Sequence, residues 1–180
     1  MANDERPDAG PHDEAARREL AERVGQLAGE HGMTVAAAES LTGGMISMAL
    51  ATASGSGEWF RGSVVAYQSD VKHKVLDVAR GPVVSAEAAS TMARSVRGLL
   101  NADVAVAVTG AGGPSSQDGR DPGTVFLAVD AESAHRTARL QIEDDDPARV
   151  CAITAATALR MIIQLLERAP GTERKRRSQG

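Results

Sequence analysis

The sequence predicts an α/β fold: a three-layer α/β/α sandwich with a mixed, mostly parallel sheet. Two observations predict it. Segments with apolar residues at helical spacing alternate with short β-prone runs along most of the 180 residues. One run, residues 104–108, is apolar throughout, which is typical of a strand covered by helices on both faces. We expect one domain over residues 15–167, between a disordered acidic tail (1–14) and a disordered basic tail (168–180).

The first half of the chain predicts two helix-and-strand units. Apolar residues at helical spacing predict the first helix, namely Ala16, Leu20, Val24 and Leu27. Residues 34–38 then form a short strand that stops at Glu39-Ser40. An apolar helix follows Gly44 and ends near residue 53, and a Gly/Ser turn occupies 54–57. A strand at 63–67 and a short helix at 69–76 complete this half.

The second half starts with a helix capped by Ser85, with an apolar side at Ala89, Met92, Ala93, Val96 and Leu100. After the strand at 104–108, residues 125–129 and 137–142 predict a hairpin with a polar connection at 130–135. Asp146 and Pro147 start the final helix. Its buried side is predicted at Val150, Ile153, Thr157, Met161 and Leu165.

Composition excludes several classes of function. The net charge of -4 is mild and the charges are mixed, so we expect no nucleic-acid partner, and we interpret the basic run at 174–177 as a solvated tail. The single cysteine, Cys151, excludes an internal disulfide, and the four scattered histidines predict neither a metal site nor a cofactor. The polar N-terminus is not a signal peptide, and no stretch approaches the roughly 20 apolar residues of a membrane span. We therefore expect a cytoplasmic location.

Two segments follow apolar strands directly, where ligands bind in open α/β sheets. The first is residues 39–44, Glu-Ser-Leu-Thr-Gly-Gly. Ser40 at this turn exposes a hydroxyl, and the amides of Leu41, Thr42 and Gly43 are free to bind an oxyanion. The alternative is that Ser40 or Thr42 is only the N-cap of the next helix.

The second segment is the glycine-rich connection at 109–123. Long loops inside compact domains are usually binding loops, although a disordered surface loop is the alternative. No Gly-Lys-Ser/Thr follows, and the spacing is not that of a dinucleotide fingerprint. Its amides, with Arg120, could hold a phosphate or carboxylate.

Three blocks occur in a characteristic order: Ala-Glu-Ser-Leu-Thr-Gly-Gly at 38–44, Gly-Ser-Val-Val-Ala-Tyr at 62–67 with Lys72, and Thr-Gly-Ala-Gly-Gly-Pro at 109–114 with Gly-Thr-Val at 123–125. In this order and spacing they resemble the CinA C-terminal domain family, the nicotinamide-mononucleotide amidohydrolases. The resemblance covers residues 15–167. It implies metal-free hydrolysis of nicotinamide mononucleotide to nicotinic acid mononucleotide and ammonia, in pyridine-nucleotide salvage.

The resemblance also implies roles for single residues. Ser40 falls on the nucleophile, Lys72 on its base and Tyr67 on the tyrosine beside them, and Ser–Lys pairs are a known variant of the triad. Lysine accepts a proton near neutral pH only if its pKa is lowered, so Lys72 should be partly enclosed. The residues expected to contact substrate are Glu39, Thr42, Gly43, Gly44, Arg61, Thr109, Gly110, Gly112, Gly113 and Arg120.

The sequence departs from the family pattern at two places. Leu41 stands where members usually have cysteine, which changes the packing behind the nucleophile. The loop carries Arg120-Asp121-Pro122 instead of Lys-Pro-Val and is about one residue shorter. The alternatives are therefore a non-catalytic, CinA-like nucleotide-binding or regulatory domain, and an amidase for another small amide. We expect a small-molecule nucleotide substrate, no membrane partner, a homodimer, and no room in residues 1–15 for the N-terminal domain of longer CinA proteins.

Overall fold

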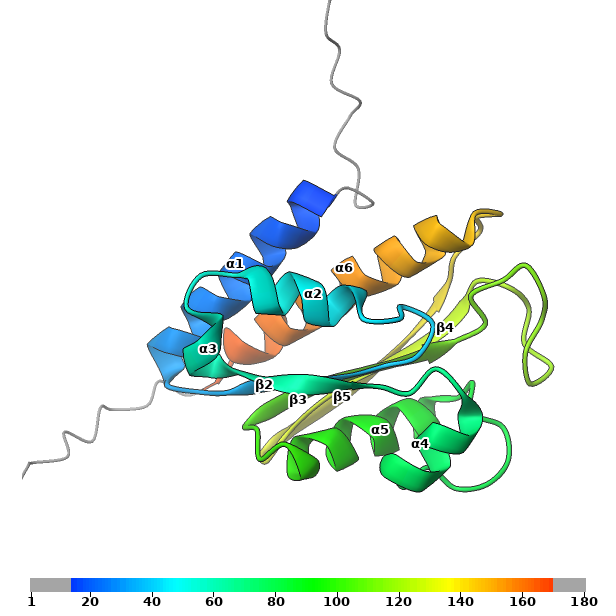
Figure 1. The fold of residues 1–180 in the computed structure, drawn as a ribbon, viewed down its shortest axis with the longest axis horizontal. Helices are drawn as coiled ribbons and strands as arrows, with labels where there is room; N and C mark the ends of the chain where they lie inside the picture. The colour runs from blue at the N-terminus through cyan, green and yellow to red at the C-terminus, as the bar shows by residue number, and fades with distance from the viewer. Residues whose placement is uncertain (1–13, 170–180) are drawn as a thin grey trace, which may run out of the picture.

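The computed structural model describes residues 14–169, and Figure 1 shows their arrangement. The predicted tails lie almost wholly outside this range. In chain order the elements are α1 (Glu14–His31), β1 (Val35–Glu39), α2 (Met45–Thr52), α3 (Ser56–Trp59), β2 (Phe60–Val65), α4 (Ser69–Val75), α5 (Ala86–Leu99), β3 (Val104–Gly110), β4 (Thr124–Ala131), β5 (Ala134–Gln141) and α6 (Pro147–Leu166).

The five strands form one open mixed sheet in the order β2-β1-β3-β4-β5. The pairs β1–β2 and β1–β3 are parallel, whereas β3–β4 and β4–β5 are antiparallel. The expectation of a mixed sheet is confirmed, but the sheet is not mostly parallel. The reason is that no helix connects β3 to β4 or β4 to β5, so the chain reverses direction at both connections.

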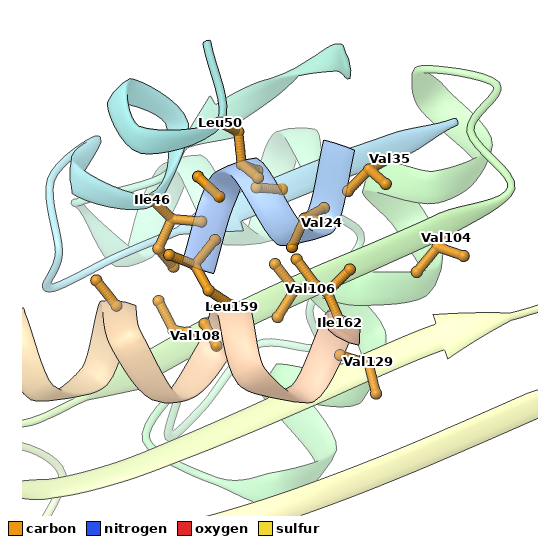
Figure 2. Close-up of a cluster of buried hydrophobic side chains, with 14 of the residues drawn as sticks. Val24, Val35, Ile46, Leu50, Val104, Val106, Val108, Val129, Leu159 and Ile162 are labelled. Carbon is orange, nitrogen blue, oxygen red and sulfur yellow. The ribbon is translucent and has the colours of Figure 1, made fainter. Parts of the chain in front are cut away.

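Helices cover both faces of the sheet, which confirms the predicted three-layer fold (Figure 1). α1, α2 and α6 pack on one face, and α4 and α5 lie on the other. Alternate residues of β3 serve the two layers, because Val104, Val106 and Val108 join the first core and the intervening alanines join the second. Figure 2 shows these valines meeting Ile46, Leu159 and other side chains of the first layer.

The two predicted helix caps are present. The Ser85 hydroxyl accepts a hydrogen bond from the Ala88 amide at 3.1 Å, and the Asp146 carboxylate accepts one from the Ala148 amide at 2.9 Å. α6 is, however, long and apolar enough to span a membrane by length and composition, with a mean hydropathy of 1.5, contrary to expectation. Most of that helix is buried, and its apolar side packs in the first core, so α6 is a core helix of this domain.

Three boundaries differ from the prediction. β2 lies at Phe60–Val65, because β1 pairs with these residues, and Tyr67 therefore lies beyond the strand. Part of the predicted Gly/Ser turn forms the short helix α3. The hairpin strands β4 and β5 extend until only residues 132–133 connect them. β5 is a largely exposed, polar edge strand, so its first residues carry no apolar signal.

Candidate active site

A cavity of about 310 Å³ lies where β1 and β3 end and α6 begins. This is the edge of the sheet where ligands are expected in open α/β folds. Its volume is at the lower end of the range for small-molecule sites, roughly 300–1,000 Å³. The residues around it are Ser40, Leu41, Tyr67, Gly110, Gly112, Gly113, Ser115, Ser116, Gln117, Pro147 and Cys151.

Ser40 follows β1 directly, is 6% exposed and lines the cavity. The main chain turns sharply here, because the Gly43 amide donates to the Ser40 carbonyl at 3.0 Å. Among the described residues, no group accepts a hydrogen bond from the amides of Leu41 or Thr42, or bonds to the Ser40 hydroxyl. Two free donors beside a free hydroxyl are what a nucleophile with an oxyanion hole requires.

Glu39 has a structural place and not the predicted substrate contact. It is fully buried, and its carboxylate accepts hydrogen bonds from the amides of Gly44 (3.2 Å), Ile46 (3.0 Å) and Ser47 (2.8 Å) and from the hydroxyls of Thr42 (2.7 Å) and Ser47. The first amides of a helix lack intrahelical partners, and a carboxylate at this end also interacts favourably with the positive end of the helix dipole. Glu39 therefore holds the start of α2 against the end of β1.

The same contacts identify the N-cap of α2 and place Thr42, Gly43 and Gly44, which are predicted above to contact substrate. Neither Ser40 nor Thr42 is the N-cap of α2, because Gly44 occupies that position with a left-handed φ of 107° and Glu39 supplies the acceptor. Thr42 uses its hydroxyl on Glu39, and Gly43 and Gly44 use their amides within the turn. These three residues line a different hollow, between α1 and α2, and not the cavity beside Ser40.

Lys72 on α4 is fully buried. Burial lowers the pKa of its ammonium group from 10.5 to about 8, and the negative charge of Asp118 acts in the opposite direction. Its Nζ donates to the Tyr67 carbonyl at 3.2 Å, and no hydrogen bond joins it to Ser40 within the described residues. Lys74, two positions on, is exposed and pairs with Asp70 at 2.7 Å. Burial thus separates two lysines that helical spacing alone cannot distinguish.

Tyr67 connects Lys72 to the cavity. The residue lines the cavity and is 65% exposed, while its carbonyl oxygen accepts a hydrogen bond from Lys72 Nζ. Lys72 therefore lies directly behind a wall that Tyr67 forms. This is the enclosed position that a neutral lysine near physiological pH requires.

The loop of residues 111–123, which we call the cavity loop, forms the opposite wall. A Cβ on Gly110 would stand 2.7 Å from the Thr124 carbonyl oxygen, so only glycine fits where the loop leaves β3. Gly112 lies against the Leu41 side chain, which brings the loop beside Ser40. Thr109 is predicted above to contact substrate, but it does not line the cavity. Its buried hydroxyl instead donates to the Val83 carbonyl at 2.8 Å.

Both predicted arginines lie away from the cavity. Arg61 is at the amino end of β2, where its Nε donates to the Leu100 carbonyl at 3.2 Å. Because β1 and β2 are parallel, this is the edge of the sheet opposite Ser40. Arg120 stacks its guanidinium over the Phe126 ring at 5.7 Å. None of the described residues that line the cavity is cationic.

Sequence reasoning missed several residues of this site. Ser115, Ser116 and Gln117 lie in a loop that was identified, but no pattern distinguishes them from its other polar residues. Pro147 and Cys151 come from the start of α6, far along the chain, and only the fold brings them here. The Cys151 thiol donates to the Leu41 carbonyl at 3.0 Å, and burial raises the pKa of this thiol.

Comparisons with known proteins agree with this fold. The family model of the CinA C-terminal domain matches residues 17–166. A CinA-like protein of Geobacter metallireducens is 42% identical over 142 residues, 76% of this chain and 34% of that protein. A putative competence-damage inducible protein of Bacillus subtilis is 42% identical over 107 residues, 57% of this chain and 26% of that protein. The chain thus matches only about a quarter to a third of these relatives.

Solved structures cover the domain more fully. The competence damage-inducible protein A of Klebsiella pneumoniae subsp. pneumoniae superposes with a TM-score of 0.81 at 28% identity, covering 86% of this chain and 99% of that chain. The competence/damage inducible protein of Agrobacterium tumefaciens gives a TM-score of 0.79 at 32% identity, covering 83% and 95%. The chain belongs to the CinA C-terminal domain family.

Proposed function

We propose that this protein hydrolyses the carboxamide of nicotinamide mononucleotide to nicotinic acid mononucleotide and ammonia, with Ser40 as nucleophile and Lys72 as base. One observation carries the proposal: Ser40, with an unbonded hydroxyl, lines a cavity, and a fully buried lysine with a pKa of about 8 bonds to the carbonyl of Tyr67 in the cavity wall. With that pKa, about a tenth of the Lys72 amine is neutral at pH 7. A neutral amine is the form that can take a proton.

In the first step, the neutral Lys72 amine takes the Ser40 proton and the serine oxygen attacks the amide carbon. The carbonyl oxygen becomes an oxyanion, which the free amide of Leu41 at the cavity can stabilise. The Lys72 ammonium then returns the proton to the departing nitrogen, which leaves as ammonia. An ester joins Ser40 to the nicotinoyl group.

In the second step, water replaces the serine oxygen. Lys72 takes a proton from the water, the resulting hydroxide oxygen attacks the ester carbon, and the Leu41 amide stabilises the second oxyanion. When the ester bond breaks, the proton on Lys72 passes to the Ser40 oxygen. The acid product leaves and the enzyme regains its starting state.

This mechanism requires Lys72 Nζ to turn from the Tyr67 carbonyl toward Ser40. The four-carbon stem of lysine is flexible, which allows Nζ to exchange one hydrogen-bond partner for another. Catalytic hydrogen bonds are often loose in the unliganded protein and tighten when substrate binds. The contact of Nζ with Tyr67 would be the resting state of the base.

A second candidate is an amidase for a small uncharged amide. The observation that favours it is that no cationic side chain lines the cavity among the described residues, so a phosphate would depend on the hydroxyls of Ser115 and Ser116 and the loop amides. Neutral donors bind phosphate less strongly than a bidentate arginine does. We therefore propose that the 5′-phosphate contributes less to substrate affinity here than it would if Arg61 or Arg120 contacted it.

A cytoplasmic location and a homodimer remain predictions.

The test is an assay of ammonia release by the purified protein. Nicotinamide mononucleotide is compared with nicotinamide riboside and nicotinamide, so that the ribose and phosphate contributions separate. The proposal predicts ammonia from the mononucleotide at the highest kcat/KM. Faster release from the riboside or from free nicotinamide would favour the second candidate. No release from any of the three by the folded protein would contradict both amidase functions and favour a non-catalytic nucleotide-binding domain, which isothermal titration with the mononucleotide would then detect.

A further inference from the structure

Asp118 is an exposed residue of the cavity loop whose carboxylate bonds to a distant part of the chain. Its Oδ2 accepts hydrogen bonds from the amides of Val83 (2.6 Å) and Val84 (3.0 Å). These two residues lie on the connection between α4 and α5, 34 and 35 positions earlier in the sequence. Hydrogen bonds from backbone amides to a carboxylate are among the stronger ones in proteins.

Further contacts show that this is a built junction. The Thr109 hydroxyl donates to the Val83 carbonyl at 2.8 Å, so β3 holds the same residue from its other side. Gln117 and Arg120 exchange backbone hydrogen bonds at 3.1 and 2.9 Å, which closes a tight turn around Asp118. Ser115, Ser116 and Gln117, which line the cavity, come directly before Asp118. The junction therefore fixes the end of the cavity wall.

The Asp118 charge also acts on the buried lysine, although no ion pair joins the two groups among the described residues. Asp118 is the charged group that acts on Lys72, and it favours the protonated amine. The other ionisable groups on α4 are engaged elsewhere: Lys74 pairs with Asp70, and His73 Nδ1 lies 2.9 Å from the Val78 carbonyl. The negative charge that acts on Lys72 thus comes from the cavity loop and not from α4.

We propose that Asp118 is a positioning residue of the active site: its carboxylate fastens the cavity loop to Val83 and Val84 and, held there, acts as a counter-charge on Lys72 without forming an ion pair with it. This role rests on the proposed function. It assigns two tasks to one side chain, and the tasks can be separated. Asparagine keeps an oxygen acceptor without the charge, whereas alanine removes both.

The charge is tested with Asp118→Asn. Without the counter-charge, the pKa of Lys72 should fall below about 8, so the acid limb of the kcat/KM profile for ammonia release should move to lower pH. The same shift should appear without any turnover in the ¹³C NMR titration of lysine labelled at Cε. The chain has lysines only at 72, 74 and 175, so the spectrum is simple, and Lys72→Arg assigns the resonance.

The junction is tested with Asp118→Ala. Amide hydrogen exchange at Val83 and Val84 should accelerate at least about tenfold, because both amides lose their acceptor, and Asp118→Asn should retain much of the protection. kcat/KM should fall by about tenfold or more in the alanine variant, from a looser cavity wall. Asp121→Asn is the matched control, since its side chain makes no hydrogen bond to a described residue.

The outcomes separate this proposal from the proposed function. If no variant and no wild-type protein releases ammonia, the NMR titration and hydrogen exchange still decide the role of Asp118. A Lys72 resonance that titrates at the same pH in wild type and Asp118→Asn would overturn the counter-charge. Unchanged exchange at Val83 and Val84 in Asp118→Ala would overturn the junction.

Discussion

Lys72 is an unfavourable residue for a protein core, because an ammonium group loses its hydration when it is enclosed. Its pKa of about 8, against an ordinary 10.5, corresponds to about 3 kcal/mol of destabilisation at neutral pH. Residues that weaken a fold in this way are concentrated at functional sites. At the residue scale, then, Lys72 and the unbonded Ser40 hydroxyl are the two features that packing alone does not explain.

Ser40→Ala should abolish amide hydrolysis and leave the fold intact. The hydroxyl makes no hydrogen bond to a described residue, so the free energy of unfolding should change by less than about 1 kcal/mol. Loss of the nucleophile should lower kcat at least about 10³-fold. Ammonia release and thermal melting measure the two effects. Ser133→Ala, in the hairpin at the opposite edge of the sheet, is the control, and a Ser40→Ala protein with a tenth of wild-type activity would exclude Ser40 as nucleophile.

Lys72→Met should stabilise the protein at pH 7 by about 2 kcal/mol. The variant removes the buried charge, worth about 3 kcal/mol, and loses one hydrogen bond to the Tyr67 carbonyl, worth about 1 kcal/mol. Urea denaturation at several pH values measures the difference.

The sign of its pH dependence follows from the lowered pKa. Between about pH 8 and 10.5 the unfolded chain binds more protons at this lysine than the folded chain, so wild-type stability rises with pH across that window. The advantage of Lys72→Met should therefore shrink as the pH approaches 10.5. Lys74→Met, at an exposed position, should show no such trend. An advantage that is constant with pH would mean that Lys72 is not buried as a charged group.

At the scale of elements, the turn between β1 and α2 depends on Glu39. Only donors surround this carboxylate, three of them amides at or beside the start of α2. The buried Glu39 carboxylate thus holds the turn that carries Ser40 and the unbonded amides of Leu41 and Thr42. This explains why Glu-Ser-Leu-Thr-Gly-Gly forms a site although Glu39, Thr42, Gly43 and Gly44 do not line the cavity.

Glu39→Gln should destabilise the protein by about 2–4 kcal/mol, because the new amide group directs hydrogens at donors and leaves them without an acceptor. Activity should fall with it, since the turn that carries Ser40 loosens. Chemical denaturation and ammonia release measure both, and Glu58→Gln on the exposed part of α3 is the control. A Glu39→Gln protein as stable as wild type would show that another group holds the turn.

Elements with strong local signals could be predicted from the sequence. Caps at Ser85 and Asp146 and the apolar run at 104–108 gave α5, α6 and β3 nearly at their observed bounds. The start of β2 could not be predicted, because pairing with β1 decides it and not the local pattern. The sequence also does not predict how many strand pairs are parallel and how many are antiparallel, because this depends on how each connection crosses the sheet.

At the scale of the whole molecule, the candidate site combines the ends of β1 and β3, Tyr67, the cavity loop and the start of α6. The resemblance to the family points to Ser40, Tyr67 and Lys72, and the glycine-rich loop is indicated by its length and its place after a strand. The sequence does not exclude Arg61 from the substrate site, because only the parallel pairing of β1 and β2 shows that it lies at the edge of the sheet opposite Ser40. Asp118 and Cys151 carry no sequence signal and reach the site through long-range contacts.

The central claim is that neutral Lys72 activates Ser40, and kcat for ammonia release in Lys72→Arg, measured across pH, tests it most directly. Guanidinium stays protonated wherever the protein is folded, so Lys72→Arg keeps the charge but cannot accept a proton. The account predicts a kcat at least about 10³-fold below wild type at every pH, whereas Lys74→Arg, on the exposed side of α4, stays near wild type. A Lys72→Arg protein within about tenfold of wild-type kcat would contradict the Ser–Lys mechanism.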